Sequence, residues 1–379
     1  MRKIYSAESV SIAHPDKIAD QISDAILDAF LAGDPKAHVA VETTVTQERI
    51  ILAGEITSST VIDYEKIVRQ VVGEIYAGST MGLDLNKLQI QNFISGQSKD
   101  IAQAVERGGA GDQGIMIGYA TDETDCMMPM PVVLANTLME FLRLMREKNE
   151  ITYLGPDAKC LVEIAYEGIQ PMKIHTIILS TQHEEGVSPH YLRQDLKPRI
   201  EKLLPKELFT NELNLLINPA DRFVIGGTKS DTGVTGRKQM VDAYGVCVRQ
   251  GGGAFSGKDP TKVDRSGAYL ARYIAKNIVK TALAKRCEVM LTYAIGKPLP
   301  VTLQIDTLGT SEIPDTVFET IVPKVFALDV RGLIKMLDLE RPIYLKTAYG
   351  GHFGRSDPDF TWERTDKIQE IVKACHELR

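Results

Sequence analysis

Apolar residues recur at helical spacing over residues 15–32, which predicts an amphipathic helix. The stripe consists of Ile18, Ile22, Ile26 and Phe30, with Ala25 and Ala29 beside it. Pro15 suits the first helical position, and Gly33 suits the end of the helix. Asp16 then lies in the first turn, where the helix dipole favours a carboxylate.

Two strands are predicted next, over residues 38–46 and 49–57. A two-residue link between them would pair Thr46 with Arg49, so that residue 42 faces residue 53. Glu42 and Glu55 then share one face of the hairpin. These carboxylates either belong to a site or mark an exposed outer face, and the pattern leaves both readings open.

Helical and strand-like segments alternate along the rest of the chain, which predicts a mixed α and β class. Two polar, glycine-rich stretches, 92–111 and 225–258, predict long loops, which are often lids. Further helices are expected at 60–77, 131–148, 191–204, 265–285, 316–327 and 366–376, and further strands at 160–166, 173–181, 213–218, 287–295 and 300–306.

The composition is that of a soluble globular protein, and 379 residues are more than one core usually serves. The formal net charge of -6 disfavours a nucleic-acid partner. The five cysteines form no CxxC pair, which fits a reducing, cytoplasmic location. The N-terminus lacks the apolar core of a signal peptide, and no apolar stretch is long enough to predict a membrane span.

The strongest chemical signal is the string RQGGGAFSGKDPTKVD at residues 249–264. Its glycines let the backbone approach a ligand closely, and two lysines, Lys258 and Lys262, follow just before a helix. Asp264 beside these lysines suggests a divalent metal that bridges to phosphate.

Residues 252–258 also match the start of a P-loop. The next residue is Asp259 rather than Ser or Thr, and Pro260 prevents a helix from continuing directly. A P-loop is therefore disfavoured, which leaves phosphate binding in another geometry or a structural glycine turn.

A second glycine-rich string, GGTKSDTGVTGRK at residues 226–238, carries Asp231 and the adjacent pair Arg237-Lys238. The arginine can bind an anion through two N–H groups at once, and the adjacent lysine adds a second positive charge, so the pair favours an anion site. A solvated turn is the alternative. Phe223 just upstream could stack on a base, and a core phenylalanine on a strand is the alternative.

Two shorter motifs are open to similar alternatives. At the helix start, His14 could donate to a leaving-group oxygen and Asp16 could hold a metal, or both could simply cap the helix. Asp157-Ala158-Lys159 is a short polar break before a strand, for which a surface turn is the favoured alternative.

The basic groups at four separate places, with two candidate metal carboxylates, suit polyphosphate chemistry. The sequence offers no Ser-His-Asp or Cys-His set, so covalent catalysis has no obvious nucleophile.

Three strings resemble signatures of the S-adenosylmethionine synthetase family: HPDKIADQISDAILD (14–28), GAGDQGIMIGYATDET (109–124) and GGGAFSGKD (251–259). The similarity runs from about residue 3 to residue 370. It implies an α+β fold of three similar β-α-β-β-α-β domains related by a pseudo-threefold axis. The expected domains are residues 1–100, 107–225 and 226–379.

The resemblance also implies a reaction. Methionine sulfur attacks C5′ of ATP and displaces tripolyphosphate, which is then hydrolysed to phosphate and diphosphate. The expected cofactors are Mg²⁺, two ions per site, and K⁺. The expected assembly is a homodimer that shares two active sites, commonly paired into a tetramer.

Site residues follow from the resemblance position by position. The catalytic set is His14, Lys159, Arg237 and Lys258. The other residues implied around ATP are Asp157, Arg222, Phe223, Asp231, Lys238 and Ala254. Those implied around methionine are Glu55, Gln97, Asp112, Asp231 and Lys262. Asp16 and Asp264 match the magnesium ligands, and Glu42 matches the potassium carboxylate.

The sequence departs from the family in two places. The loop between Gln97 and Gly109 is short, with Lys99 where proline is frequent, and TAYGGHFGR replaces the usual TAAYGHFGR at residues 347–355. Two rival functions are another ATP-dependent phosphate-transferring enzyme, such as a kinase or ligase, and an inactive regulatory subunit. Tripolyphosphate formation would exclude the first, and the charged site residues that are still present disfavour the second.

Overall fold

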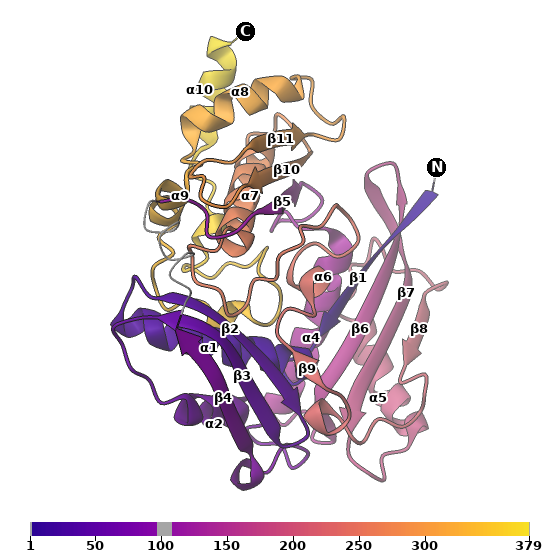
Figure 1. Cartoon of the computed structure of the whole chain (residues 1–379). Helices are drawn as coiled ribbons and strands as arrows, with labels where there is room; N and C mark the ends of the chain where they lie inside the picture. The colour runs from indigo at the N-terminus through magenta and orange to yellow at the C-terminus, as the bar shows by residue number, and fades with distance from the viewer. Residues whose placement is uncertain (1, 97–107, 379) are drawn as a thin grey trace.

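The computed structural model describes residues 2–96 and 108–378, and its elements run in repeated order (Figure 1). The first run is β-α-β-β-α-β: β1 (Arg2–Val10), α1 (Pro15–Gly33), β2 (His38–Thr46), β3 (Arg49–Thr57), α2 (Tyr64–Ile75) and β4 (Gln89–Gly96). The second run repeats it: β5 (Gly114–Thr121), α4 (Met130–Glu147), β6 (Leu154–Glu167), β7 (Gln170–His183), α5 (Pro189–Glu201) and β8 (Asn214–Ile217).

The third run begins in the same order and ends in helices. It comprises β9 (Gly233–Val234), α6 (Gln239–Asp242), α7 (Val263–Lys280), β10 (Arg286–Tyr293), β11 (Thr302–Asp306), α8 (Asp315–Val325), α9 (Val330–Met336) and α10 (Ile368–Glu377). The chain thus has the three-domain, mixed α+β architecture that the sequence predicts.

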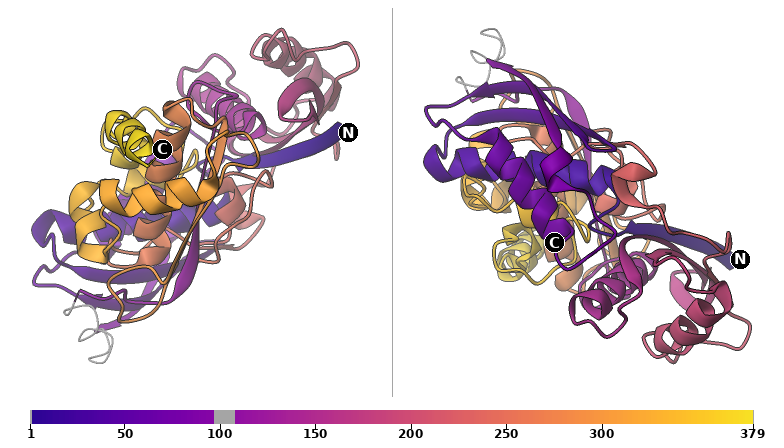
Figure 2. Two further views of the ribbon diagram at one scale, coloured as in Figure 1. Left: turned by 90° about the horizontal axis from the view of Figure 1, so that it is seen from above. Right: turned by 90° about the horizontal axis from the view of Figure 1, so that it is seen from below.

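The three sheets exchange strands in a cycle. Strand β1 joins the sheet β1-β6-β7-β8, β5 joins the sheet β11-β10-β5, and β9 joins the sheet β4-β3-β2-β9. Each run of elements therefore gives its first strand to a sheet that another run builds. In both views of Figure 2, the indigo strand β1 extends away from the rest of the first run. No run completes a sheet alone, so the three parts must fold together.

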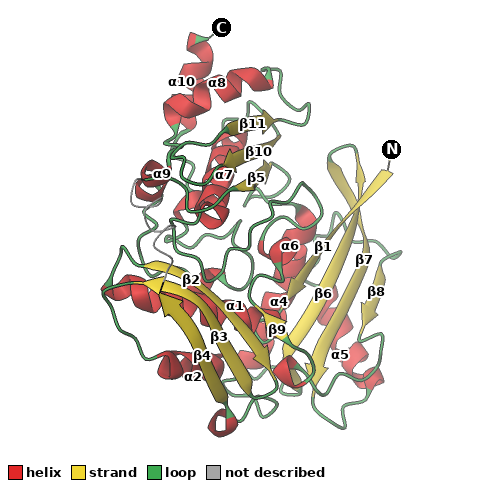
Figure 3. Ribbon diagram, viewed as in Figure 1, coloured by secondary structure: helices red, strands yellow, loops and turns green. Residues whose placement is uncertain are grey.

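Helices cover one face of each sheet (Figure 3). Helix α1 packs on β2, α4 on β6 and β1, and α7 on β5 and β10. The predicted stripe of α1 forms core, with Ile18, Ile22 and Ile26 fully buried. Its polar side is buried as well, because Asp16, Asp20 and Asp24 are also inaccessible to solvent.

The predicted hairpin is confirmed residue by residue. Thr46 pairs with Arg49, Glu42 pairs with Ala53, and Glu55 pairs with Ala40. Alternate residues of β2 are buried, and Glu42 and Glu55 both lie on the exposed face. The register follows from the two-residue link and from the apolar alternation, which are both local properties.

Several predicted boundaries are wrong. The loop predicted from residue 92 begins later, because β4 continues through Gly96 as a largely exposed strand parallel to β3. Strand β6 starts at Leu154, earlier than the predicted residue 160. Strands β1 and β5 and helix α9 were not predicted, since the strands are set by pairing with partners far along the chain.

Helix α7 lies directly on β5 at Gly118. A Cβ atom there would come within 2.0 Å of the carbonyl carbon of Ala271 and 2.3 Å of its oxygen. We expect Gly118→Ala to lower the free energy of unfolding by about 1–3 kcal/mol, because backbone cannot give way as a side chain can. The urea midpoint measures this.

Gly73→Ala is the matched control. Gly73 lies inside helix α2, where the added methyl would meet only Leu85 Cδ1 at 3.5 Å. This variant should be neutral or up to about 1 kcal/mol more stable. Equal midpoints for the two variants would contradict the close packing of α7 on β5.

Candidate functional site

Asp16 stands at the start of α1 as the centre of a charged cluster. Its Oδ1 atom accepts the N–H of Val234 at 3.0 Å and lies 3.1 Å from Nε of Arg237. Its Oδ2 atom accepts a hydrogen bond from Nζ of Lys238. The carboxylate itself is fully buried. The predicted pair Arg237-Lys238 and the predicted carboxylate are therefore brought together.

His14 caps the same helix, since its Nδ1 atom accepts the N–H of Asp16 at 3.2 Å. His14 can therefore cap the helix through Nδ1 and still belong to the site, because capping does not use its Nε2 atom. Burial, and next the charge of Lys238, lower the pKa of His14 to about 4. The ring is therefore neutral near pH 7, and because Nδ1 is an acceptor, the proton is on Nε2.

Burial would raise the pKa of Asp16, but the hydrogen bonds from Lys238 and Val234 hold it below its usual value. The carboxylate therefore stays ionised beside a neutral imidazole. A carboxylate that two cations already compensate can exchange one of them for a metal ion without leaving a bare buried charge.

Asp157 is not in a surface turn, which corrects one reading of the sequence. It lies inside β6, is 5% exposed, and accepts the N–H of Gly227 at 2.7 Å. Burial raises its pKa to about 6. Lys159, two residues along, is half exposed and pairs with Glu8 of β1 at 3.1 Å.

The 249–264 segment forms a second charged group. Nζ of Lys258 lies 2.6 Å from Oδ2 of Asp264, and Nζ of Lys262 lies 2.7 Å from Oδ2 of the buried Asp259. Helix α7 begins at Val263 rather than directly after Lys258, so the rejection of a P-loop is confirmed.

The glycines of this segment serve packing at the carboxylate. A Cβ atom on Gly253 would come within 2.2 Å of Cγ of Asp264, and one on Gly251 within 2.5 Å of the Ile115 carbonyl oxygen. Gly252, in contrast, faces open space. At Gly251 and Gly253 the backbone must therefore come close to other groups of the protein itself, rather than to a ligand.

Strand β2 connects the two charged groups. Lys258 forms a bridge with Ala40, which in turn pairs with Glu55, so these three residues form one row across the sheet. Four residues along β2, Thr44 pairs with Val234, the residue that donates to Asp16. The two groups thus meet β2 roughly 13 Å apart, with Glu42 between them on the same face.

The remaining predicted residues are less closely tied to these groups. Arg222 is exposed and pairs with Glu185 at 2.9 Å. Phe223 is half-buried in a loop rather than on a strand, and its N–H donates to His183. Asp112 and Asp231 are exposed in turns.

Ala254 lies against Gly236 in the second glycine-rich string. Gln97 and the predicted lid at 97–109, up to residue 107, lie outside the described residues.

Sequence reasoning missed the aspartates deeper on α1. Asp20 accepts the N–H of Gly236 at 2.8 Å, and Asp24 accepts the N–H of Gly257 at 2.8 Å. Asp28 accepts the N–H groups of Tyr344 and Leu345. The signal was present, because aspartates recur every four residues on a helix that was already predicted.

The geometry predicts the protonation of His14 in the free protein. NMR of histidine-labelled protein should show a neutral ring with the proton on Nε2 between about pH 5 and 8, because the lowered pKa keeps the neutral form until pH approaches about 4. Lys238→Met should raise the pKa of His14, since it removes the largest charge effect. A wild-type midpoint near 6.5 would contradict the assignment.

Comparison with known proteins identifies the family of the chain. Family models match the N-terminal, central and C-terminal domains of S-adenosylmethionine synthetase at residues 2–99, 107–223 and 225–364. An S-adenosylmethionine synthase of Treponema denticola is 47% identical over 382 residues, which cover 98% of each chain. No helix among the described residues is long and apolar enough to cross a membrane. The chain belongs to the S-adenosylmethionine synthetase family.

Proposed function

We propose that this protein makes S-adenosylmethionine from ATP and L-methionine, and then hydrolyses the displaced tripolyphosphate to phosphate and diphosphate. One observation carries the proposal: the cations and carboxylates of both glycine-rich segments meet along strand β2. The site is rich in groups that stabilise anionic charge, as this reaction requires.

The reaction needs no protein nucleophile. The methionine thioether forms a bond to C5′ of ATP while the C5′–O bond breaks, and the sulfur has no proton to lose. The difficulty is the negative charge that develops on the departing oxygen. His14, neutral with its proton on Nε2, can donate a hydrogen bond to that oxygen. Arg237, Lys238, Lys159 and Lys258 hold the triphosphate.

The carboxylates fit magnesium brought in by the phosphates. Mg²⁺ commonly uses one or two protein carboxylates together with substrate phosphates, rather than a complete protein cage. Asp16 and Asp264 lie in separate groups, each beside a lysine. These residues would hold two ions, which neutralise phosphate charge when bound. We assign K⁺ to the exposed carboxylate of Glu42.

The other residues are assigned to substrate recognition. We assign contacts with methionine to Glu55, Asp112, Asp231 and Lys262. Gln97, which lies outside the described residues, is assigned to methionine as well. Phe223 is half-buried and stacks on adenine, with Asp157, Arg222, Asp231 and Ala254 also near ATP.

We also propose a cytoplasmic homodimer, in turn paired into a tetramer, with two sites shared between subunits of each dimer. Large apolar side chains exposed on the sheets support this. Phe93 of β4 is 66% exposed and Ile115 of β5 is 49% exposed. The domains are assigned to residues 1–100, 107–225 and 226–379, each of which gives one strand to a neighbour.

Product analysis tests the activity. Incubation with ATP, methionine, Mg²⁺ and K⁺ should give S-adenosylmethionine, phosphate and diphosphate in equal amounts by mass spectrometry and phosphate assay. ADP or AMP as the only nucleotide product would instead indicate a kinase or ligase, and unchanged ATP would indicate a regulatory subunit.

Substitutions test the charge-stabilising roles. Lys258→Ala and Asp16→Asn should each lower kcat by about 10²–10³, because the groups act on charge that develops in the transition state. Methionine affinity should change much less. Lys197→Ala, on the exposed side of α5, is the control and should be unaffected. A loss of methionine affinity with kcat intact would contradict these roles.

A further inference from the structure

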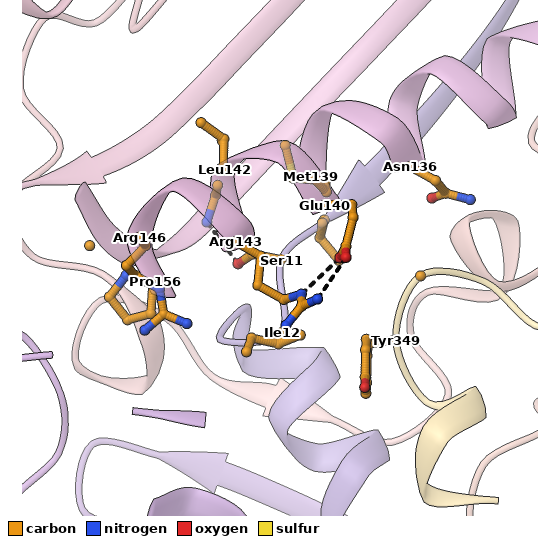
Figure 4. Close-up of a pocket in the computed structure, with 14 residues that line it drawn as sticks. Ser11, Ile12, Asn136, Met139, Glu140, Leu142, Arg143, Arg146, Pro156 and Tyr349 are labelled. Atoms are coloured by element: carbon orange, nitrogen blue, oxygen red, sulfur yellow. Dashed lines mark hydrogen bonds and ion pairs between the residues drawn. The ribbon is translucent and has the colours of Figure 1, made fainter. Parts of the chain in front are cut away.

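A small cavity lies behind the end of β1, between helix α4 and the loop at residues 349–350 (Figure 4). Its volume is about 50 Å³, enough for a few waters or one small polar group. Most of its wall is apolar, formed by Val10, Ile12, Met139, Leu142 and Pro156.

Arg146 brings a positive charge into this apolar wall. Its side chain is only 10% exposed, and its Nη1 atom is buried without any hydrogen-bond partner among the described residues. The nearest carboxylate, Glu147, lies 3.8 Å from Nη2. A guanidinium does not deprotonate in proteins, so a buried donor without a partner is costly.

The neighbouring carboxylates are already engaged. Arg143 takes both oxygens of Glu140 at 2.7 and 2.6 Å, and it also takes Oε2 of Glu147 at 2.6 Å. Figure 4 shows the Arg143–Glu140 pair as dashed lines. Among the described residues, Nη1 of Arg146 is thus a buried cationic donor that no carboxylate accepts at hydrogen-bonding distance, although Glu140 also lines the wall and Glu147 pairs with Nη2.

Other groups on the wall can also donate. The Ser11 hydroxyl oxygen accepts the N–H of Ala158 at 2.8 Å, which leaves its own proton available. Oδ1 of Asn136 accepts the Ser9 hydroxyl at 2.8 Å, which leaves the amide N–H groups of this lining residue as further donors.

We propose that this cavity is a binding site for a small carboxylate, held by the guanidinium of Arg146 and separate from the catalytic site. A planar carboxylate matches the guanidinium fork, and the apolar wall suits a short aliphatic tail. A pocket of about 410 Å³ shares Asn136 with it, and another of about 440 Å³ shares Arg143 and Tyr349.

The cavity lies on the opposite side of the backbone from the catalytic groups. Ser11 precedes His14 by three residues, and Ala158 stands between Asp157 and Lys159 in strand β6. Because successive strand residues face opposite ways, Ala158 faces the cavity while Lys159 faces away from it.

Calorimetry and thermal unfolding of the full-length protein test the site, with acetate and propionate as probes at constant ionic strength. Saturating carboxylate should raise Tm by about 2 °C or more. Arg146→Met should abolish that shift, and Arg146→Lys, which keeps the charge without the fork, should weaken binding about tenfold. Arg199→Met, on helix α5 and paired with Asp195, is the control and should respond as wild type.

In carboxylate-free buffer, Arg146→Met should have an equal or higher Tm than wild type, because it removes a buried charge that lacks a partner. Lower Tm values for both Arg146 variants in that buffer would mean a structural role and would overturn the proposal. A rise in Tm with chloride or phosphate as large as that with acetate would overturn the carboxylate assignment. So would a carboxylate effect that persists in Arg146→Met.

Discussion

The buried aspartates of helix α1 hold the site together. Asp16, Asp20, Asp24 and Asp28 lie one above another because residues four apart share a helix face. They accept backbone N–H groups from Val234, Gly236, Gly257 and the pair Tyr344–Leu345, which lie in three different segments of the chain. Hydrogen bonds to charged groups are worth about 1.5–3 kcal/mol each, so one helix fixes the position of both glycine-rich segments.

Cations compensate three carboxylates of this row, whereas burial raises the pKa of the fourth, Asp28, to about 7. Lys17 contacts Asp20 and Asp242, and Arg265 takes both oxygens of Asp24 at 2.7 and 3.0 Å. The polar side of α1 is therefore core rather than surface. At the N-terminal end of the row, the cations that compensate Asp16 are Arg237 and Lys238. These are the residues that we assign to the triphosphate, so the row of aspartates ends at the proposed site.

Strand exchange adds a second constraint. Because β1, β5 and β9 each complete a sheet of another part of the chain, no part reaches full pairing alone. The exchange has a functional result, since it is β9 on the edge of β2 that places Val234, Arg237 and Lys238 beside Asp16. The groups that we assign to catalysis are thus positioned by long-range pairing, although each stands in a local motif.

Local physics determined much of this protein from sequence. The extent of α1 and the hairpin register that puts Glu42 and Glu55 on one face both follow from periodicity and turn length. Only the tertiary structure decided that Asp157 is buried in a strand, that the exposed segment Gln89–Gly96 is a strand at all, and that Nη1 of Arg146 has no hydrogen-bond partner among the described residues. These features depend on which distant backbone or carboxylate lies within hydrogen-bonding distance, and spacing along a chain does not encode that.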